Sequence, residues 1–187
     1  KVPIHWNYLN QIDGWTGRTT GLFWGIGLNV LMFLMLYLLH WYSPWYNKYA
    51  GRFEKILPPL TTTLLACFST ISLYSLYVAK WGEVSGVKLI LVLIGLFLFF
   101  FGNLMPKVPK NMFVGIRTPW TSANELVWER THRLGGWLFV TGGIVMILKG
   151  LILTGSALFQ NITTVLALGC LLYPLPYSFI QYKKLVK

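Results

Sequence analysis

Five apolar stretches, each about as long as a helix that crosses a lipid bilayer, limit what this chain can fold into. A membrane-spanning helix needs about 20 apolar residues to cross the hydrocarbon core. The stretches lack the alternation of apolar and polar residues that membrane β-strands require. We therefore expect an all-α, polytopic membrane helix bundle, with spans at residues 21–42, 60–79, 87–105, 135–153 and 158–180.

The composition excludes an ordinary soluble domain. Hydrophobic residues make up 55% of the sequence and charged residues only 11%, whereas a soluble domain carries about 25% charged residues. The net charge of +11 does not indicate a nucleic-acid partner, because the basic residues lie between the apolar stretches, where they orient a protein in the membrane. Cys67 and Cys170 fall inside apolar stretches, which favours small buried side chains over a disulfide or a metal site.

The distribution of lysine and arginine predicts the orientation of the bundle. Five of these residues fall on the side of the N-terminus and eleven on the other side of the expected spans. Since basic residues concentrate in cytoplasmic loops, we expect the N-terminus of the chain outside and the C-terminus in the cytoplasm. An outside N-terminus without a leader is unusual, so we also expect that a first transmembrane helix precedes Lys1, giving six spans in all.

Prolines and one lysine refine the expected spans. Pro58 and Pro59 would occupy the first turn of the second span, where a backbone N–H has no helical acceptor. Pro174 and Pro176 would kink or break the fifth span. Lys149 lies near the end of the fourth span, and we expect it to extend its ammonium group to the membrane surface.

The loop at residues 106–134 gathers charge and tryptophan in an otherwise apolar chain. Ser122 and Glu125 have the spacing of a capping box, which predicts the start of a helix. Glu129 and Arg133 are spaced i,i+4 in the order that favours an ion pair. We expect an amphipathic helix that lies on the inner membrane surface and runs into the fourth span.

Several details of this loop stay open at the level of sequence. Gly135-Gly136 would let the chain bend or let another helix pack closely. Arg117 would bridge backbone carbonyls or a carboxylate, and Thr118-Pro119 would fix a turn. The whole loop is either an anchor, in which basic residues meet anionic lipid, or a docking surface for a partner, for which Trp and Arg are common anchors.

A second polar segment, at residues 1–20, opens the chain on the expected outer side and precedes the transmembrane bundle at residues 21–187. Asp13-Gly14 is typical of a turn. His5 and Asp13 are candidates for a hydrogen bond or half of a metal site, although a metal needs more ligands than the segment offers. The segment is either a recognition surface for a peptide or lipid, or a folded cap over the bundle.

Two other functional classes remain as alternatives. The sequence contains no zinc-protease helix, nucleophile elbow or phosphate loop, and we predict no catalytic, cofactor-binding or metal-binding residue. A small-molecule transporter would need polar groups at mid-depth, for which Asn29 and Asn103 are the candidates. A membrane metal-dependent enzyme would have to use one of two pairs: His5 with Asp13, or His132 with Glu129.

The stretch FVGIRTPWTSANELVWERTHRLGG, residues 113–136, resembles the signature of the SdpI family, the immunity proteins for the sporulation-delaying toxin of Gram-positive bacteria. That signature is Gly-Ile-Arg-Thr-Pro-x-Thr, then a Trp, then Thr-His-Arg or Thr-His-Lys before small residues. The matching positions are Gly115, Ile116, Arg117, Thr118, Pro119, Thr121, Trp128, Thr131, His132 and Arg133. The start of the chain is similar to an N-terminal domain often joined to this family, with matches at His5, Trp6, Asn7, Asp13, Gly14 and Trp15.

The resemblance implies a multi-pass protein of the cell membrane with two roles. One role is protection against a secreted toxin peptide, and the other is recruitment of an ArsR-type repressor to the membrane. We therefore predict a cytoplasmic partner surface at Arg117, Thr118, Pro119, Trp120, Trp128, His132 and Arg133. We predict extracellular recognition at His5, Trp6, Asn7, Asp13 and Trp15.

Overall fold

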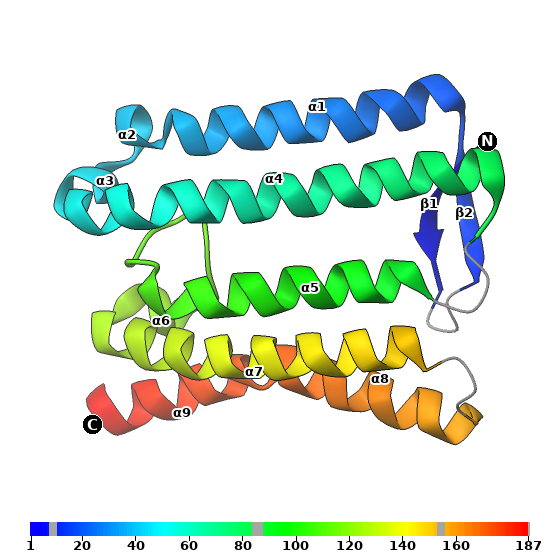
Figure 1. The fold of residues 1–187 in the computed structure, drawn as a ribbon. Coiled ribbons are helices and arrows are strands. Elements are labelled where there is room, and N and C mark those ends of the chain that lie inside the picture. The colour runs from blue at the N-terminus through cyan, green and yellow to red at the C-terminus, as the bar shows by residue number, and fades with distance from the viewer. Residues whose placement is uncertain (8–10, 84–87, 153–155, 187) are drawn as a thin grey trace.

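A short β-hairpin precedes a series of helices in the computed structural model, which describes residues 1–7, 11–83, 88–152 and 156–186 (Figure 1). Five of the described helical segments are long and apolar enough to cross a membrane, so the all-α membrane bundle is confirmed. The elements in chain order are β1 (Val2–Trp6), β2 (Ile12–Thr16), α1 (Arg18–Tyr37), α2 (Leu39–Tyr42), α3 (Pro44–Lys48), α4 (Ala50–Trp81), α5 (Leu89–Leu104), η1 (Met105–Lys107), α6 (Pro119–Ala123), α7 (Glu125–Leu151), α8 (Ala157–Leu172) and α9 (Pro174–Val186).

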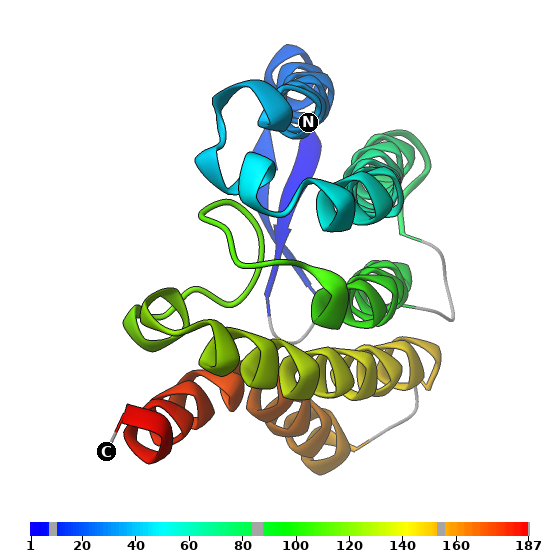
Figure 2. The ribbon, with the colours of Figure 1, turned by 90° about the vertical axis from the view of Figure 1, so that its left-hand side faces the viewer.

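The long helices lie side by side in the order in which they occur in the chain (Figure 1 and Figure 2). α1 contacts α4, α4 contacts α5, α5 contacts α7, and α7 contacts both α8 and α9. α1 lies at the edge of the bundle against α4, and Leu36 is the only buried residue in this fully described helix. Its outward-facing side chains, such as Phe23 and Trp24, are exposed, as lipid-facing side chains would be.

Glycines allow α5 and α7 to pack closely. A Cβ atom on Gly95 would lie 2.6 Å from the carbonyl oxygen of Gly143, and one on Gly136 would lie 2.7 Å from that of Gly102. Any side chain at these positions would force the backbones apart. Of the two roles expected for Gly135-Gly136, close packing is confirmed, whereas a bend is not found, because α7 runs through the pair without a break.

The bundle has two ends, and we name them for what lies there (Figure 1). The hairpin, formed by the strands β1 and β2, lies at the hairpin end, together with the C-terminal end of α4 and the first turn of α5. The segment between η1 and α6, residues 108–118, is called the motif loop; it lies at the loop end, with α2, α3 and α9. The segments that the sequence assigns to opposite sides of the membrane are thus at opposite ends of the bundle.

The expected start of the second span is wrong. α4 begins at Ala50 rather than at residue 60, so Pro58 and Pro59 lie inside the helix and remove two of its backbone hydrogen bonds. The expected continuation of the amphipathic helix into the fourth span is confirmed, because α7 begins at Glu125 and is continuous to Leu151. A single continuous helix cannot lie flat on the membrane surface and also cross the membrane, so the expected surface position does not fit this geometry.

The remaining boundaries agree better with expectation. α8 ends at Leu172 and α9 begins at Pro174, so the expected break in the fifth span is confirmed. The expected limits Val87 and Leu153 lie outside the described residues.

The expected position of Lys149 at the membrane surface is wrong. Lys149 is 3% exposed, and its Nζ donates a hydrogen bond to Oγ1 of Thr164 at 2.5 Å.

The N-terminal segment forms strands where a turn was expected. β1 and β2 pair antiparallel, with His5 opposite Gly14 and an irregular register on either side of His5. Asp13 and Gly14 lie inside β2 rather than at the turn. A Cβ atom on Gly14 would lie 2.7 Å from Cβ of His5, so glycine serves here to let the two strands approach rather than to reverse the chain.

Candidate functional site

Asn111 folds the first half of the motif loop around its own side chain. Its Oδ1 accepts hydrogen bonds from the backbone N–H groups of Phe113 (2.7 Å) and Val114 (2.8 Å). Its Nδ2 donates to the carbonyls of Pro109 (2.7 Å) and Val114 (3.1 Å). A buried amide whose donors and acceptor are all used holds a loop in one conformation, so Asn111 fixes the path into the family signature.

His132 joins α7 to the second half of the motif loop. Its Nε2 accepts a hydrogen bond from the backbone N–H of Ile116 at 3.0 Å, and its Nδ1 donates to the carbonyl of Trp128 at 2.8 Å. The ring also stacks on the Trp128 indole, with centroids 4.0 Å apart. Because one ring nitrogen accepts and the other donates, these contacts specify a neutral imidazole with its proton on Nδ1.

Gly115 makes the approach of the loop to His132 possible. Its φ angle is +119°, in the region that residues with a Cβ atom rarely adopt. A Cβ atom here would also come closer than 3.0 Å to Nε2 of His132. The Gly-Ile pair of the signature thus acts through its backbone. Gly115 lets the loop approach the imidazole, and Ile116 supplies the N–H group that binds it.

A chain of hydroxyl groups connects the loop to α9. Thr118 caps α6, with its Oγ1 accepting from the backbone N–H of Thr121 at 3.1 Å, and Oγ1 of Thr121 donates to the carbonyl of Ile116 at 2.9 Å. Oγ1 of Thr118 lies 3.0 Å from Oγ of Ser178, which donates to the carbonyl of Leu175 at 2.6 Å. The hydrogen bond between the Thr118 and Ser178 hydroxyls joins residues 60 positions apart in the chain.

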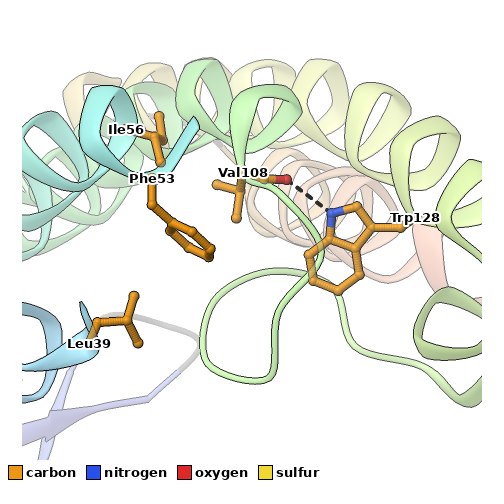
Figure 3. Close-up of a cluster of buried hydrophobic side chains, with 5 residues drawn as sticks. All are labelled: Leu39, Phe53, Ile56, Val108 and Trp128. Atoms are coloured by element: carbon orange, nitrogen blue, oxygen red, sulfur yellow. Dashed lines mark hydrogen bonds between the residues drawn. The ribbon is translucent and has the colours of Figure 1, made fainter. Parts of the chain in front are cut away.

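Trp128 anchors the loop to the helices that precede it. Its Nε1 donates to the carbonyl of Val108 at 3.0 Å, and the indole is 1% exposed (Figure 3). Around it lies a buried apolar cluster drawn from α2, α4 and the motif loop: Leu39, Phe53, Ile56 and Val108. Satisfying the indole N–H inside an apolar cluster lets a large aromatic side chain be buried without a polar penalty.

The structure separates the predicted cytoplasmic partner surface into two groups. Thr118, Trp128 and His132 are buried, so in this structure they hold the loop and cannot meet a partner. Arg117, Pro119 and Arg133 are exposed, and Trp120 is half-buried. Of the two roles expected for Arg117, the bond to a backbone carbonyl is found, since its guanidinium donates to Met112. The Trp120 ring packs on Phe179, with centroids 5.0 Å apart.

The expected helix cap and ion pair of this region are both replaced. The N-cap of α7 is Asn124, whose Oδ1 accepts from the N–H groups of Leu126 (2.9 Å) and Val127 (3.1 Å), so the expected Ser122–Glu125 capping box is wrong. Among the described residues, the recorded ion pair of Glu129 is with Arg52 of α4, at 3.4 Å, rather than with Arg133.

The predicted extracellular residues lie together at the hairpin end. His5 Nδ1 is 2.5 Å from Oδ1 of Asp13, which confirms the expected hydrogen bond. Trp6 stacks on Tyr74 of α4, with centroids 6.0 Å apart, and its Nε1 donates to Glu83. Trp15 is 48% exposed. At the end of the strands, the backbone N–H of Asn7 donates a hydrogen bond to the carbonyl of Gln11, and Oδ1 of Asn7 accepts one from the backbone N–H of Gln11. The hairpin is therefore fixed to the bundle and leaves Trp15 outward.

The groups expected for a transporter do not come together. Asn29 donates to the carbonyl of Gly25 (2.7 Å) and accepts from Ser69 (3.1 Å), between α1 and α4. Asn103 donates to the carbonyl of Phe99 at 2.8 Å and is exposed on α5. Each amide thus serves the helices that carry it, as polar groups in membrane helices commonly do.

The groups expected for a metal enzyme are also occupied. Both ring nitrogens of His132 are used in hydrogen bonds, and Glu129 pairs with Arg52. His5 and Asp13 form a pair of possible ligands, but no group of three or more such side chains that could hold a metal occurs in the described ranges 1–7, 11–83, 88–152 and 156–186.

Comparisons with known proteins match the part of the chain that carries this geometry. Residues 107–178 match the model of the SdpI/YfhL protein family. The resemblance to the SdpI family is confirmed. The immunity protein SdpI of Bacillus subtilis (strain 168) is 26% identical over 185 residues, which cover 99% of this chain and 85% of that protein. No solved structure matches the chain.

The SdpI/YfhL match contains the whole hydrogen-bonded frame of the motif loop. It starts beside Val108, the acceptor for Trp128, and it ends at Ser178, the hydrogen-bond partner of Thr118. Sequence reasoning missed Asn111 and Ser178. The spacing of a short polar residue before Phe-Val-Gly was a weak signal for Asn111, whereas nothing in the sequence marks Ser178, because its partner lies on another element.

Proposed function

We propose that this chain is an immunity protein of the cell membrane, which protects against a secreted toxin peptide and signals by holding an ArsR-type repressor at the membrane. The observation that carries the proposal is the likeness to the Bacillus subtilis immunity protein over 185 residues, because that likeness includes both the hairpin and the motif loop. A membrane-embedded helix bundle is the setting in which such protection would act.

The two ends of the bundle support a division of labour. Trp15 and the His5–Asp13 pair are exposed at the hairpin end, where a secreted peptide would arrive. The excess of basic residues at the loop end supports a cytoplasmic position for the motif loop and the C-terminus. A protein with these two surfaces on opposite sides of a membrane is suited to report an external peptide to an internal partner.

The loop end also has the charge that would attract a partner with an acidic face. Arg52, Arg130 and Arg133 line a hollow of about 390 Å³ beside Glu129, between α4 and α7. Basic surfaces of this kind raise the association rate of acidic partners and fix their orientation. We assign the contact itself to the exposed Arg117 and Arg133 with Trp120, and the support of the loop to Thr118, Trp128 and His132.

Survival of toxin-sensitive cells tests the immunity role. Cells that express the wild-type chain from an unregulated promoter should survive the secreted toxin peptide, and Trp15→Ala should reduce that survival. Trp137→Ala is the matched control, because Trp137 is 71% exposed on α7 outside both surfaces. Equal killing of cells with and without the wild-type chain would end the immunity proposal.

Localisation of the repressor tests the signalling role separately. A fluorescent ArsR-type repressor should move to the membrane after toxin addition in cells with the wild-type chain. Arg133→Ala together with Trp120→Ala should abolish this movement but leave survival unchanged, since the hairpin end is intact. A repressor that stays in the cytoplasm with the wild-type chain and toxin would remove the signalling role while leaving immunity standing.

A further inference from the structure

A partly open cavity of about 420 Å³ lies beneath the hairpin and is lined by residues of β1, α4, α5, α7 and α8. The volume is in the range of small-molecule sites. Its wall includes Ile4 of the hairpin, Ile71 of α4, Ile94 of α5, Met146 of α7 and Leu168 of α8. Leu168 is also 49% exposed on the outer face of the bundle, so the cavity borders the surface that lipid would cover.

One buried cation lines this cavity. Lys149 is 3% exposed, and Nζ uses one of its donor positions on Thr164, which also lines the cavity. All five acidic residues of the chain lie in its described part, and none of the ion pairs recorded there includes Lys149. A buried ammonium group without a counter-charge is costly, so an anionic group at this position would be strongly favoured.

The rest of the lining selects the body of the ligand. Nine of the fourteen lining residues are aliphatic or methionine, and the polar ones besides Lys149 and Thr164 are hairpin residues. A peptide would bring backbone N–H and C=O groups that need partners in apolar surroundings. An acyl chain has no such groups, so the wall can cover its whole length.

We propose that this cavity binds a single-chain fatty acid, with the carboxylate paired to Lys149 and the acyl chain along the wall formed by α4, α5 and α8. Thr164 holds the ammonium group in place between the carboxylate and α8. The hairpin closes the site, since β1 supplies one side of it. The site stands on Lys149 and the cavity alone and does not depend on the proposed immunity function.

Equilibrium binding of radiolabelled palmitate to the purified full chain in detergent tests the proposal, with hexadecanol as the uncharged analogue. The wild-type chain should bind palmitate about tenfold or more tightly than hexadecanol, because only the acid supplies the counter-charge. Lys149→Met removes the charge, keeps most of the length of the side chain, and should abolish this preference. Lys80→Met, at an exposed lysine of the same end, should retain it.

The comparison of palmitate with hexadecanol uses only the wild-type chain, so it tests the proposal even if the Lys149→Met variant does not fold. Equal affinity of the wild-type chain for palmitate and hexadecanol would overturn the proposal. So would an unchanged preference in Lys149→Met, or palmitate affinity unaffected by Leu168→Trp, which narrows the cavity. Displacement of palmitate by phosphatidylglycerol at equal concentration would instead assign the site to a phospholipid headgroup and also overturn it.

Discussion

The imidazole of His132 and the backbone N–H of Ile116 form a hydrogen bond of 3.0 Å across 16 positions of the chain. The bond is buried, and the other ring nitrogen is held by the carbonyl of Trp128. His132, which the sequence analysis assigned to a partner surface, therefore attaches the motif loop to α7. This hydrogen bond helps to hold the exposed residues of the signature in position.

His132→Ala should destabilise the protein and loosen the motif loop. The substitution leaves the buried N–H of Ile116 without an acceptor, which costs about 1–3 kcal/mol, and it removes the stacking on Trp128. Thermal unfolding in detergent and protease cleavage within residues 108–118 measure the two effects. Arg133→Ala, at the exposed neighbour, should change neither the unfolding temperature nor the cleavage of the loop. Equal sensitivity of both variants would contradict the role of His132 in holding the loop.

Gly115→Ala should be damaging although it adds only a methyl group. The φ angle of +119° disfavours a residue with a Cβ atom by about 1–3 kcal/mol, and the new atom would collide with His132. Gly51→Ala in α4 is the control, because nothing lies within 4 Å of a Cβ atom there, and alanine favours a helix. Unfolding in detergent should rank Gly115→Ala well below Gly51→Ala, and the reverse order would refute the geometry of the loop.

The start of α7 gives a test of the corrected helix cap. Asn124→Ala should lower stability by about 1 kcal/mol, the usual cost of losing an N-cap side chain, because two backbone N–H groups lose their acceptor. Ser122→Ala should have a much smaller effect. Chemical unfolding in detergent distinguishes them, and a larger loss in Ser122→Ala would restore the capping box expected from sequence.

Cysteine labelling in intact cells tests the proposed orientation. In a chain whose two cysteines, Cys67 and Cys170, are replaced by serine, Trp15→Cys should react with a membrane-impermeant maleimide from outside. Arg117→Cys should react only after permeabilisation, since both sites are exposed but lie at opposite ends of the bundle. Labelling of Arg117→Cys alone in intact cells would show that the orientation is inverted.

Hydropathy was sufficient to predict the spans but not their ends. The apolar part of a span is set by the thickness of the hydrocarbon core, whereas a helix continues beyond it for as long as its backbone is satisfied. The ten residues before residue 60 and the ten before residue 135 are polar enough to suggest loops, yet they are helical in α4 and α7. Buried apolar contacts between those extensions stabilise them, since Phe53 and Ile56 pack in one cluster with Trp128.

Side-chain positions at the site depended on contacts that a sequence does not display. His132 and Trp128 lie in a charged, tryptophan-rich stretch, which is typical of a surface, but their partners Ile116 and Val108 are brought in by the fold of the motif loop. Lys149 was expected at the membrane surface because long basic side chains usually reach it. Here the ammonium group points toward α8 instead, where Thr164 accepts its hydrogen bond.

The continuity of α7 has a mechanical consequence. Its 27 residues make a rod about 40 Å long, with His132 near one end and Lys149 near the other. Between these residues, α7 crosses α5 closely at two places, Gly136 on Gly102 and Gly143 on Gly95. Two close crossings resist a tilt of α7 relative to α5, so a displacement at the cavity would reach the frame of the motif loop only if the two helices moved together.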